Sequence, residues 1–205
     1  MKAKKVCSWV FAAAMTAAMM VSVSADTLTE TSPSGQTEVT ARIEAAAPGE
    51  VSYIITIPDV VDFGVLTQPA DPDKDDYKDV PYTVTATKLD GLDPSKQEVS
   101  VYVRDQNATI NGEQEFYIAN KSDASKKFKY DVYTVPNIVN SSVSINDETM
   151  TSAAGYYLKG FTEEGESVEG TLRLNQNQLC QYQLADIVGE YSGYMVFFSM
   201  VDDIQ

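Results

Sequence analysis

The chain contains no histidine, and it has only two cysteines and one tryptophan. The lack of histidine removes the commonest general base and the commonest zinc ligand. Of the two cysteines, Cys7 and Cys180, only Cys180 lies beyond the first 25 residues. A nucleophilic thiol usually needs a neighbouring base, and no histidine is present to supply one. We therefore expect a protein that is not an enzyme and that folds without an internal disulfide.

Positive charge is also scarce. The 15 Lys and Arg residues face 30 Asp and Glu residues, so the net charge at pH 7 is −15. Nucleic acids and anionic membrane surfaces attract patches of Lys and Arg. We expect neither as a partner.

The N-terminus has the pattern of a secretory signal peptide. Three lysines precede an apolar run over residues 6–21, and the small residues of 22–25 follow. This order of basic, apolar and small residues predicts a signal peptide over 1–25 and a secreted, extracellular or cell-surface protein. A retained membrane anchor is the alternative, although the run is short for a membrane span.

Two further regions follow the signal peptide. Residues 26–36 are rich in Thr, Ser, Pro and Gly without apolar periodicity, which is typical of a flexible linker. Residues 37–205 form the predicted folded domain. Its first segment, 37–44, places Val39, Ala41 and Ile43 on one face, which predicts a strand.

Short β-branched and aromatic runs recur along the rest of the domain, separated by Gly, Pro, Asn and Asp turn signals. No window has helical periodicity over three turns, and only 184–188 could form a single turn. The pattern predicts an all-β, Ig-like Greek-key β-sandwich with a disordered N-terminal tail. The expected strands are 51–57, 61–65, 80–87, 99–103, 115–119, 128–133, 155–161, 167–174, 179–184 and 193–201, with at most a short one at 143–145.

The stretch 51–66 is the most apolar part of this domain. Ile57 and Pro58 end its first run, because proline cannot donate to a ladder. Phe63 and Gly64 lie in the second run, where the glycine suggests a bulge or a close backbone approach.

The C-terminal stretch has a second structural motif. Gly189 and Gly193 flank Tyr191, which is well placed to bond its hydroxyl back to the chain as a tyrosine corner. The residues from Tyr194 to Val201 are apolar on both faces, so we expect this last strand to be central in its sheet.

These two motifs carry a family resemblance. Ile57-Pro58 with Phe63-Gly64, and Gly189-x-Tyr191-x-Gly193 before a Phe-rich strand, resemble segments of secreted surface β-sandwich proteins of Gram-positive bacteria. The chain is similar to pilin-like subunits and to proteins related to the WxL cell-wall-binding domain. Trp9 is the only tryptophan, so the Trp-x-Leu motifs themselves are absent. The resemblance implies a surface protein that acts in adhesion, cell-wall association or surface-fibre assembly.

An acidic loop is the candidate metal site. Asp71, Asp73 and Asp75 alternate as the first ligands of a calcium loop do, and Asp79 is a candidate further ligand. The glycine and glutamate of a full calcium loop are missing. A solvated acidic loop that binds no cofactor is the alternative.

Two kinds of partner follow from the strands and the tyrosines. The 37–44 strand could lie at an edge of its own sheet, or it could pair with the open edge of a neighbouring copy and so allow self-assembly. Another surface protein or a cell-wall or surface polymer is the expected partner. A carbohydrate-binding module is the alternative function, because Tyr102, Tyr117, Tyr133 and Tyr157 are predicted to point outward, where sugar rings could stack on them.

Overall fold

The computed structural model describes residues 51–150 and 152–204. Contacts divide the chain into Met1–Glu38 and Val39–Gln205, and all described residues belong to the second unit. The predicted signal peptide, the linker and the 37–44 strand all precede residue 51 and lie outside the described residues. No helix in the described part of the chain is long and apolar enough to cross a membrane.

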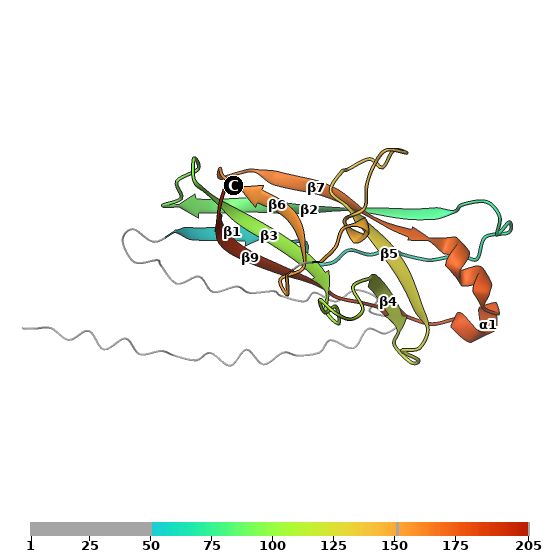
Figure 1. The fold of residues 1–205 in the computed structure, drawn as a ribbon. Helices are drawn as coiled ribbons and strands as arrows, with labels where there is room; N and C mark the ends of the chain where they lie inside the picture. Colours follow the sequence, from blue (N-terminus) through green and yellow to red (C-terminus); the bar gives the residue numbers. More distant parts are fainter. Residues whose placement is uncertain (1–50, 151, 205) are drawn as a thin grey trace, which may run out of the picture. The chain divides into compact units, whose positions relative to one another are not determined.

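Two antiparallel sheets form the domain (Figure 1), which confirms the predicted all-β sandwich. The larger sheet has six strands in the order β1-β2-β7-β5-β4-β8, and the smaller has the order β6-β3-β9. The strands are β1 (Ser52–Thr56), β2 (Tyr77–Asp90), β3 (Gln97–Asp105), β4 (Phe116–Asn120), β5 (Lys127–Tyr133), β6 (Tyr156–Phe161), β7 (Ser167–Asn175), β8 (Tyr191–Ser192) and β9 (Met195–Asp203).

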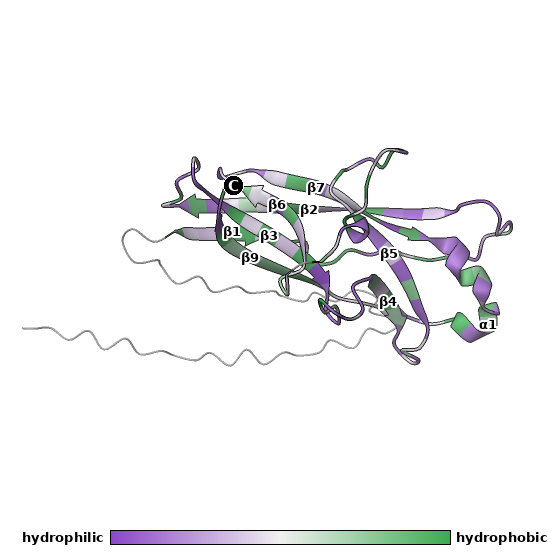
Figure 2. Cartoon of the chain, viewed as in Figure 1, coloured by the Kyte–Doolittle hydropathy of each residue, from purple (hydrophilic) through white to green (hydrophobic). Residues whose placement is uncertain are grey.

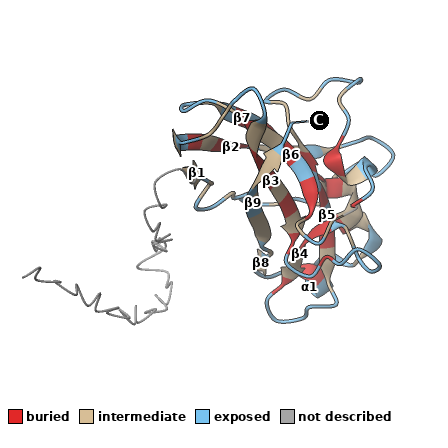
Figure 3. Ribbon diagram, turned by 60° about the vertical axis from the view of Figure 1, so that its left-hand side comes forward, coloured by how far each residue is buried: buried red, intermediate tan, exposed pale blue. Residues whose placement is uncertain are grey.

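The core lies between the two sheets. Period-2 alternation buries one face of each central strand, as in Val99, Val101 and Val103 of β3. From the larger sheet, Val84 of β2 and Val132 of β5 are equally buried. Figure 3 shows the buried residues concentrated on the strands that face one another. The alternation predicted for these strands is therefore the one that forms the core.

Two predicted strands are absent from the described fold. Residues 61–65 form no strand; they belong to an irregular segment, 57–69, that carries side chains into the core without ladder pairing. Residues 179–184 fall in a 3₁₀ helix, η2 (Gln176–Gln181), and at the start of α1 (Leu184–Ile187). The side chain of Asn175 caps η2 by accepting the N–H of Asn177, and this local bond competes with a strand. The single turn expected at 184–188 is present as α1.

Other boundaries also differ from the prediction. β2 begins at Tyr77, so Asp79 lies in a strand and not in the acidic loop. The short strand expected at 143–145 is replaced by the 3₁₀ helix η1 (Ile145–Asp147), whose N-cap is the side chain of Ser144. The prediction of a central last strand is wrong for the described sheets, because β9 pairs only with β3 there.

Candidate functional site

The edge of β9 is the sheet edge with the fewest protecting features among the described residues. Natural edge strands carry charges, prolines, bulges or short lengths that prevent pairing with other chains. β1 contains a bulge between Ile54 and Ile55, β8 has two residues, and β6 carries Lys159. Residues 195–201 of β9 contain no charged residue, proline or glycine.

Register shows which backbone groups face this edge. Gln106 donates its N–H to the Tyr194 carbonyl at 3.1 Å, and Ile204 donates its N–H to the Lys96 carbonyl at 2.8 Å. Antiparallel ladders alternate hydrogen-bonded and non-bonded pairs. The pairs formed by odd-numbered β9 residues, such as Val101 with Ser199, are therefore the non-bonded ones. The N–H and C=O groups of the odd-numbered β9 residues therefore point away from β3. These residues are Met195, Phe197, Ser199 and Val201. We call this row of backbone groups the β9 edge.

One group of the β9 edge has a partner in the described structure. The hydroxyl of Tyr53, on β1 in the other sheet, donates to the Ser199 carbonyl at 3.1 Å. The Ser199 hydroxyl in turn donates to the Tyr53 oxygen at 3.2 Å. The edges of the two sheets thus meet at this point.

The outer face of the three-stranded sheet carries a row of aromatic side chains. Tyr157 of β6 pairs with Tyr102 of β3, and Tyr102 pairs with Phe198 of β9. Tyr157 is 45% exposed and Phe198 is 48% exposed. The rings of Tyr102 and Tyr157 meet edge to face, with centroids 5.7 Å apart. We call Tyr157, Tyr102 and Phe198 the aromatic row. Figure 2 shows green, hydrophobic segments along β3 and β9.

Two carboxylates lie beside the aromatic row. Glu98 and Asp202 are direct cross-strand partners on β3 and β9. Tyr157 donates its hydroxyl to Glu98 Oε1 at 3.0 Å, and Tyr102 donates its hydroxyl to Asp202 Oδ2 at 2.9 Å. Burial, followed by the bond to Glu98, raises the pKa of Tyr157 to about 12. Both hydroxyls therefore stay protonated at neutral pH and donate to these carboxylates.

The predicted calcium ligands are not gathered into one site. Asp71 accepts the N–H of Asp73 in a local turn at 3.1 Å. Asp79 points to Arg173, which donates a hydrogen bond to each of its two carboxylate oxygens, at 2.7 and 2.6 Å. Within the described residues no group of three acidic or thiol side chains is arranged to hold a metal ion. Calcium binding by this loop stays a prediction.

The outward tyrosines divide between several environments. Tyr102 and Tyr157 lie together in the aromatic row. Tyr133 is half-buried on the larger sheet, where it faces Arg173. Tyr117 is 7% exposed, so its ring is not available for stacking as the prediction requires. Its ring packs under Lys127, whose Nζ lies 3.9 Å from the ring centroid, and its hydroxyl accepts from Asn107.

The C-terminal motif has a structural geometry. Tyr191 donates its hydroxyl to the Ile187 carbonyl at 2.8 Å, four residues upstream, which is the contact of a tyrosine corner. Gly189 has φ +150°, and a Cβ there would meet the Asn120 amide. A Cβ at Gly193 would meet the Tyr117 carbonyl oxygen at 2.2 Å, so the backbones approach closely at this position.

The N-terminal motif is structural as well. β1 ends at Thr56, just before Ile57 and Pro58, and Ile57 packs against the core. Phe63 is 7% exposed, and its ring packs beside that of Tyr130 with the ring centroids 5.6 Å apart. Gly64 has φ +64°, a left-handed conformation that glycine adopts without strain, and open space surrounds it. Neither the expected bulge nor the expected close approach is present, because residue 64 lies in no strand and no atom approaches it.

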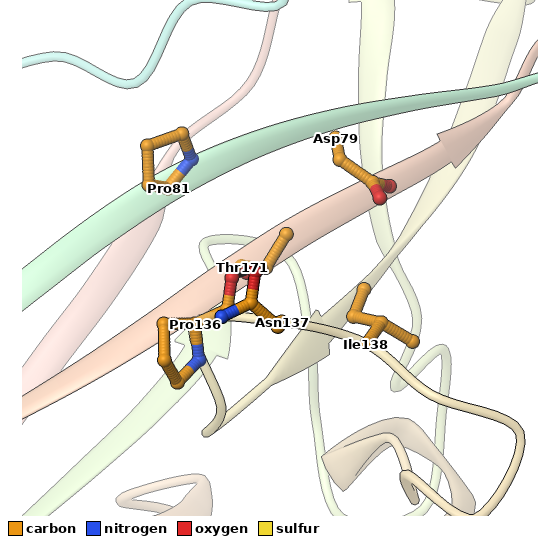
Figure 4. A pocket seen from close by; sticks show the side chains of 6 residues that line it. All are labelled: Asp79, Pro81, Pro136, Asn137, Ile138 and Thr171. Atoms are coloured by element: carbon orange, nitrogen blue, oxygen red, sulfur yellow. Dashed lines mark hydrogen bonds between the residues drawn. The ribbon is translucent and has the colours of Figure 1, made fainter.

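A shallow depression of 310 Å³ lies on the larger sheet (Figure 4). Asp79 and Pro81 of β2, Thr171 of β7 and the loop after β5 line it. Arg173 donates hydrogen bonds to the Asp79 carboxylate, and the Thr171 hydroxyl donates to the Val135 carbonyl at 2.9 Å. The Asp79 and Thr171 side chains are thus engaged within the protein.

Comparisons with known proteins give little further guidance. No protein-family model matches the chain. No curated protein matches it either. One solved structure shares 15% identity over 72% of this chain and 40% of its own, with a TM-score of 0.38; its title describes a chaperone–tip adhesin complex in the biogenesis of CFA/I fimbriae. A similarity of this size does not establish a shared topology.

Proposed function

We propose that the protein is a secreted or cell-surface β-sandwich, not an enzyme, that acts in adhesion or surface-fibre assembly by pairing the β9 edge with a strand of another chain. The observation that carries this proposal is the unprotected β9 edge. Residues 195–201 combine high β-propensity with no charge and no proline, and a segment of that kind readily pairs with other strands.

An added strand would supply the backbone hydrogen-bond partners that the β9 edge lacks. Apart from the Tyr53 bond at Ser199, none of its backbone groups has a hydrogen-bond partner among the described residues. Each backbone hydrogen bond gained contributes about 0.5–1.5 kcal/mol net. Phe198 and Met200 are also 48% and 40% exposed, so an added strand has apolar side chains to pack beside.

The 37–44 segment of a second copy is the strand that we propose pairs with this edge. Val39, Ala41 and Ile43 give it one apolar face, which matches the inward face of β9 at Phe197 and Val201. The same segment paired within its own chain is the alternative, and it would leave the protein monomeric.

Two variants test the proposal by sedimentation velocity. Ser199→Pro removes an N–H that faces the β9 edge and leaves the β3 ladder intact, so the folded chain should lose its oligomers. Ser199→Ala keeps the N–H and should assemble as the wild type does. Deletion of residues 26–46 should give a folded monomer. A wild-type chain that stays monomeric, a truncated chain that unfolds, or Ser199→Pro that still assembles contradicts the proposal.

A further inference from the structure

The aromatic row and its two carboxylates form a surface distinct from the β9 edge. The backbone N–H and C=O groups of β3 are hydrogen-bonded to β6 on one side and to β9 on the other. This face therefore presents side chains and no free backbone groups of β3. Its occupant must therefore be recognised by ring faces, hydroxyls and carboxylates.

Glu98 and Asp202 leave negative charge uncompensated at this face. Like charges directly opposite each other on neighbouring strands are destabilising. Both carboxylates accept hydrogen bonds only from neutral hydroxyls in the described structure: Glu98 from Tyr157 and Ser100, and Asp202 from Tyr102. None of the seven ion pairs among the described residues includes either of them.

The nearby cations on or next to β3 and β6 are engaged elsewhere. Lys96 pairs with Asp93 at 2.9 Å, and Lys159 lies 3.8 Å from Glu166. Arg104 donates to carbonyls of the turn after β3, including Ala108 at 3.1 Å. A cation supplied from outside the protein would therefore relieve the repulsion between Glu98 and Asp202.

The aromatic row adds a second requirement. Three rings lie side by side across three strands, over about 10 Å given the usual strand spacing. The Tyr102 and Tyr157 rings stand edge to face at 74°, so the exposed rings of Tyr157 and Phe198 are the ones available for stacking. Sugar rings stack on exposed aromatic faces, and ammonium groups are attracted to such faces. A basic peptide would gain less here, since the face offers no backbone groups for it to pair with.

We propose that the outer face of the three-stranded sheet binds a glycan that carries protonated amino groups. The sugar rings stack on Tyr157 and Phe198, which lie on either side of Tyr102, and the ammonium groups pair with Glu98 and Asp202. Charge complementarity between these two carboxylates and the amines selects this polymer over neutral or acidic glycans.

Calorimetric titration of the full chain with a β-1,4-linked glucosamine hexamer tests the proposal at mildly acidic pH, where the amines are protonated. The fully N-acetylated hexamer should bind about tenfold more weakly or not at all. A lysine hexapeptide of the same charge should also bind about tenfold more weakly. Equal affinity for the acetylated hexamer, or for the peptide, overturns the proposal.

Matched variants locate the binding. Tyr157→Ala and Asp202→Asn should each weaken binding of the glucosamine hexamer by about tenfold. Asn at 202 keeps an acceptor for the Tyr102 hydroxyl, so the sheet should stay intact. Tyr77→Ala changes a tyrosine of similar exposure, 43%, on the other sheet, and Asp203→Asn changes an exposed carboxylate on the next residue. Both controls should bind as the wild type does.

The result is separable from that of the assembly proposal. Ser199→Pro, which should abolish assembly, should leave binding of the glucosamine hexamer unchanged. Tyr157→Ala should leave the sedimentation behaviour unchanged. Loss of glycan binding in Asp203→Asn equal to that in Asp202→Asn would show a general effect of net charge and would overturn the site.

Discussion

Asp105 is a fully buried carboxyl group at the end of β3. Its Oδ1 accepts the N–H of Asn107 at 2.8 Å, and its Oδ2 has no hydrogen-bond partner among the described residues. Burial raises the pKa of Asp105, and it outweighs the hydrogen bonds from Asn107 and Tyr117, which lower that pKa. The nearby Glu113 carboxylate raises it further. This residue therefore resists ionisation in the folded state.

A raised pKa makes stability depend on pH with a definite sign. The folded state binds more protons than the unfolded state between the unfolded pKa, about 3.9, and the raised folded pKa. The contribution of Asp105 to stability is thus present below this window and is lost as pH rises through it. Asp105→Asn removes this titrating group. Urea unfolding should therefore show the variant becoming more stable relative to wild type as pH rises from 3 to 7.

The exposed Asp203→Asn variant is the control for removing one negative charge. Its stability relative to wild type should change much less over the same pH range. An Asp105→Asn variant whose relative stability is flat, or falls, as pH rises would show that Asp105 is not the group responsible.

At the scale of elements, the 57–69 segment replaces a predicted strand and is held by side chains. Thr67 donates its N–H to the Gln176 side chain at 2.9 Å, and Gln68 donates to the carbonyls of Leu179 and Tyr182 at 2.8 and 2.9 Å. Phe63 is its buried anchor. Because the segment has no ladder, its attachment depends on a few contacts of this kind.

Replacement of that anchor should be costly. Phe63→Ala should lower the free energy of unfolding by about 3–5 kcal/mol, because it leaves a cavity against Tyr130. Val65→Ala, in the same segment at a side chain that is 80% exposed, should change it by less than about 0.5 kcal/mol. Urea denaturation followed by tyrosine fluorescence measures both. Equal effects of the two substitutions would mean that the segment is not anchored through Phe63.

At the scale of the whole molecule, the net charge of −15 opposes the compact state through self-repulsion. The seven ion pairs among the described residues are mostly exposed, and such pairs contribute only about 0.2–1 kcal/mol each. Screening of the long-range repulsion should therefore outweigh screening of these pairs.

We expect the melting temperature to rise by a few degrees as sodium chloride increases from about 0.01 M to about 0.5 M, since the Debye length falls from about 30 Å to a few ångströms. Differential scanning calorimetry measures this rise. A melting temperature that falls with salt would show that the ion pairs dominate the electrostatic contribution to stability.

The sequence by itself predicts the sandwich and the inward faces of its long strands. Alternation along β2, β3 and β5 is a local property, because side chains of a strand point to opposite faces whatever lies beside it. Thus Val84, Val101 and Val132 can be assigned to the core without knowing the strand order. The geometry at Tyr191 is equally local, because its hydroxyl bonds to a residue four positions away.

Tertiary structure alone decided which apolar runs pair as strands and which sheet edges and faces stay exposed. Residues 61–65 and 179–184 have strand-like patterns, but long-range side-chain bonds from Gln68 and local capping by Asn175 override them. β9 is apolar on both faces, yet strand order places it at an edge of the described sheet. The aromatic row joins Tyr157, Tyr102 and Phe198, which only register brings together. Pairing between distant strands depends on the packing of the whole chain, and no local pattern encodes it.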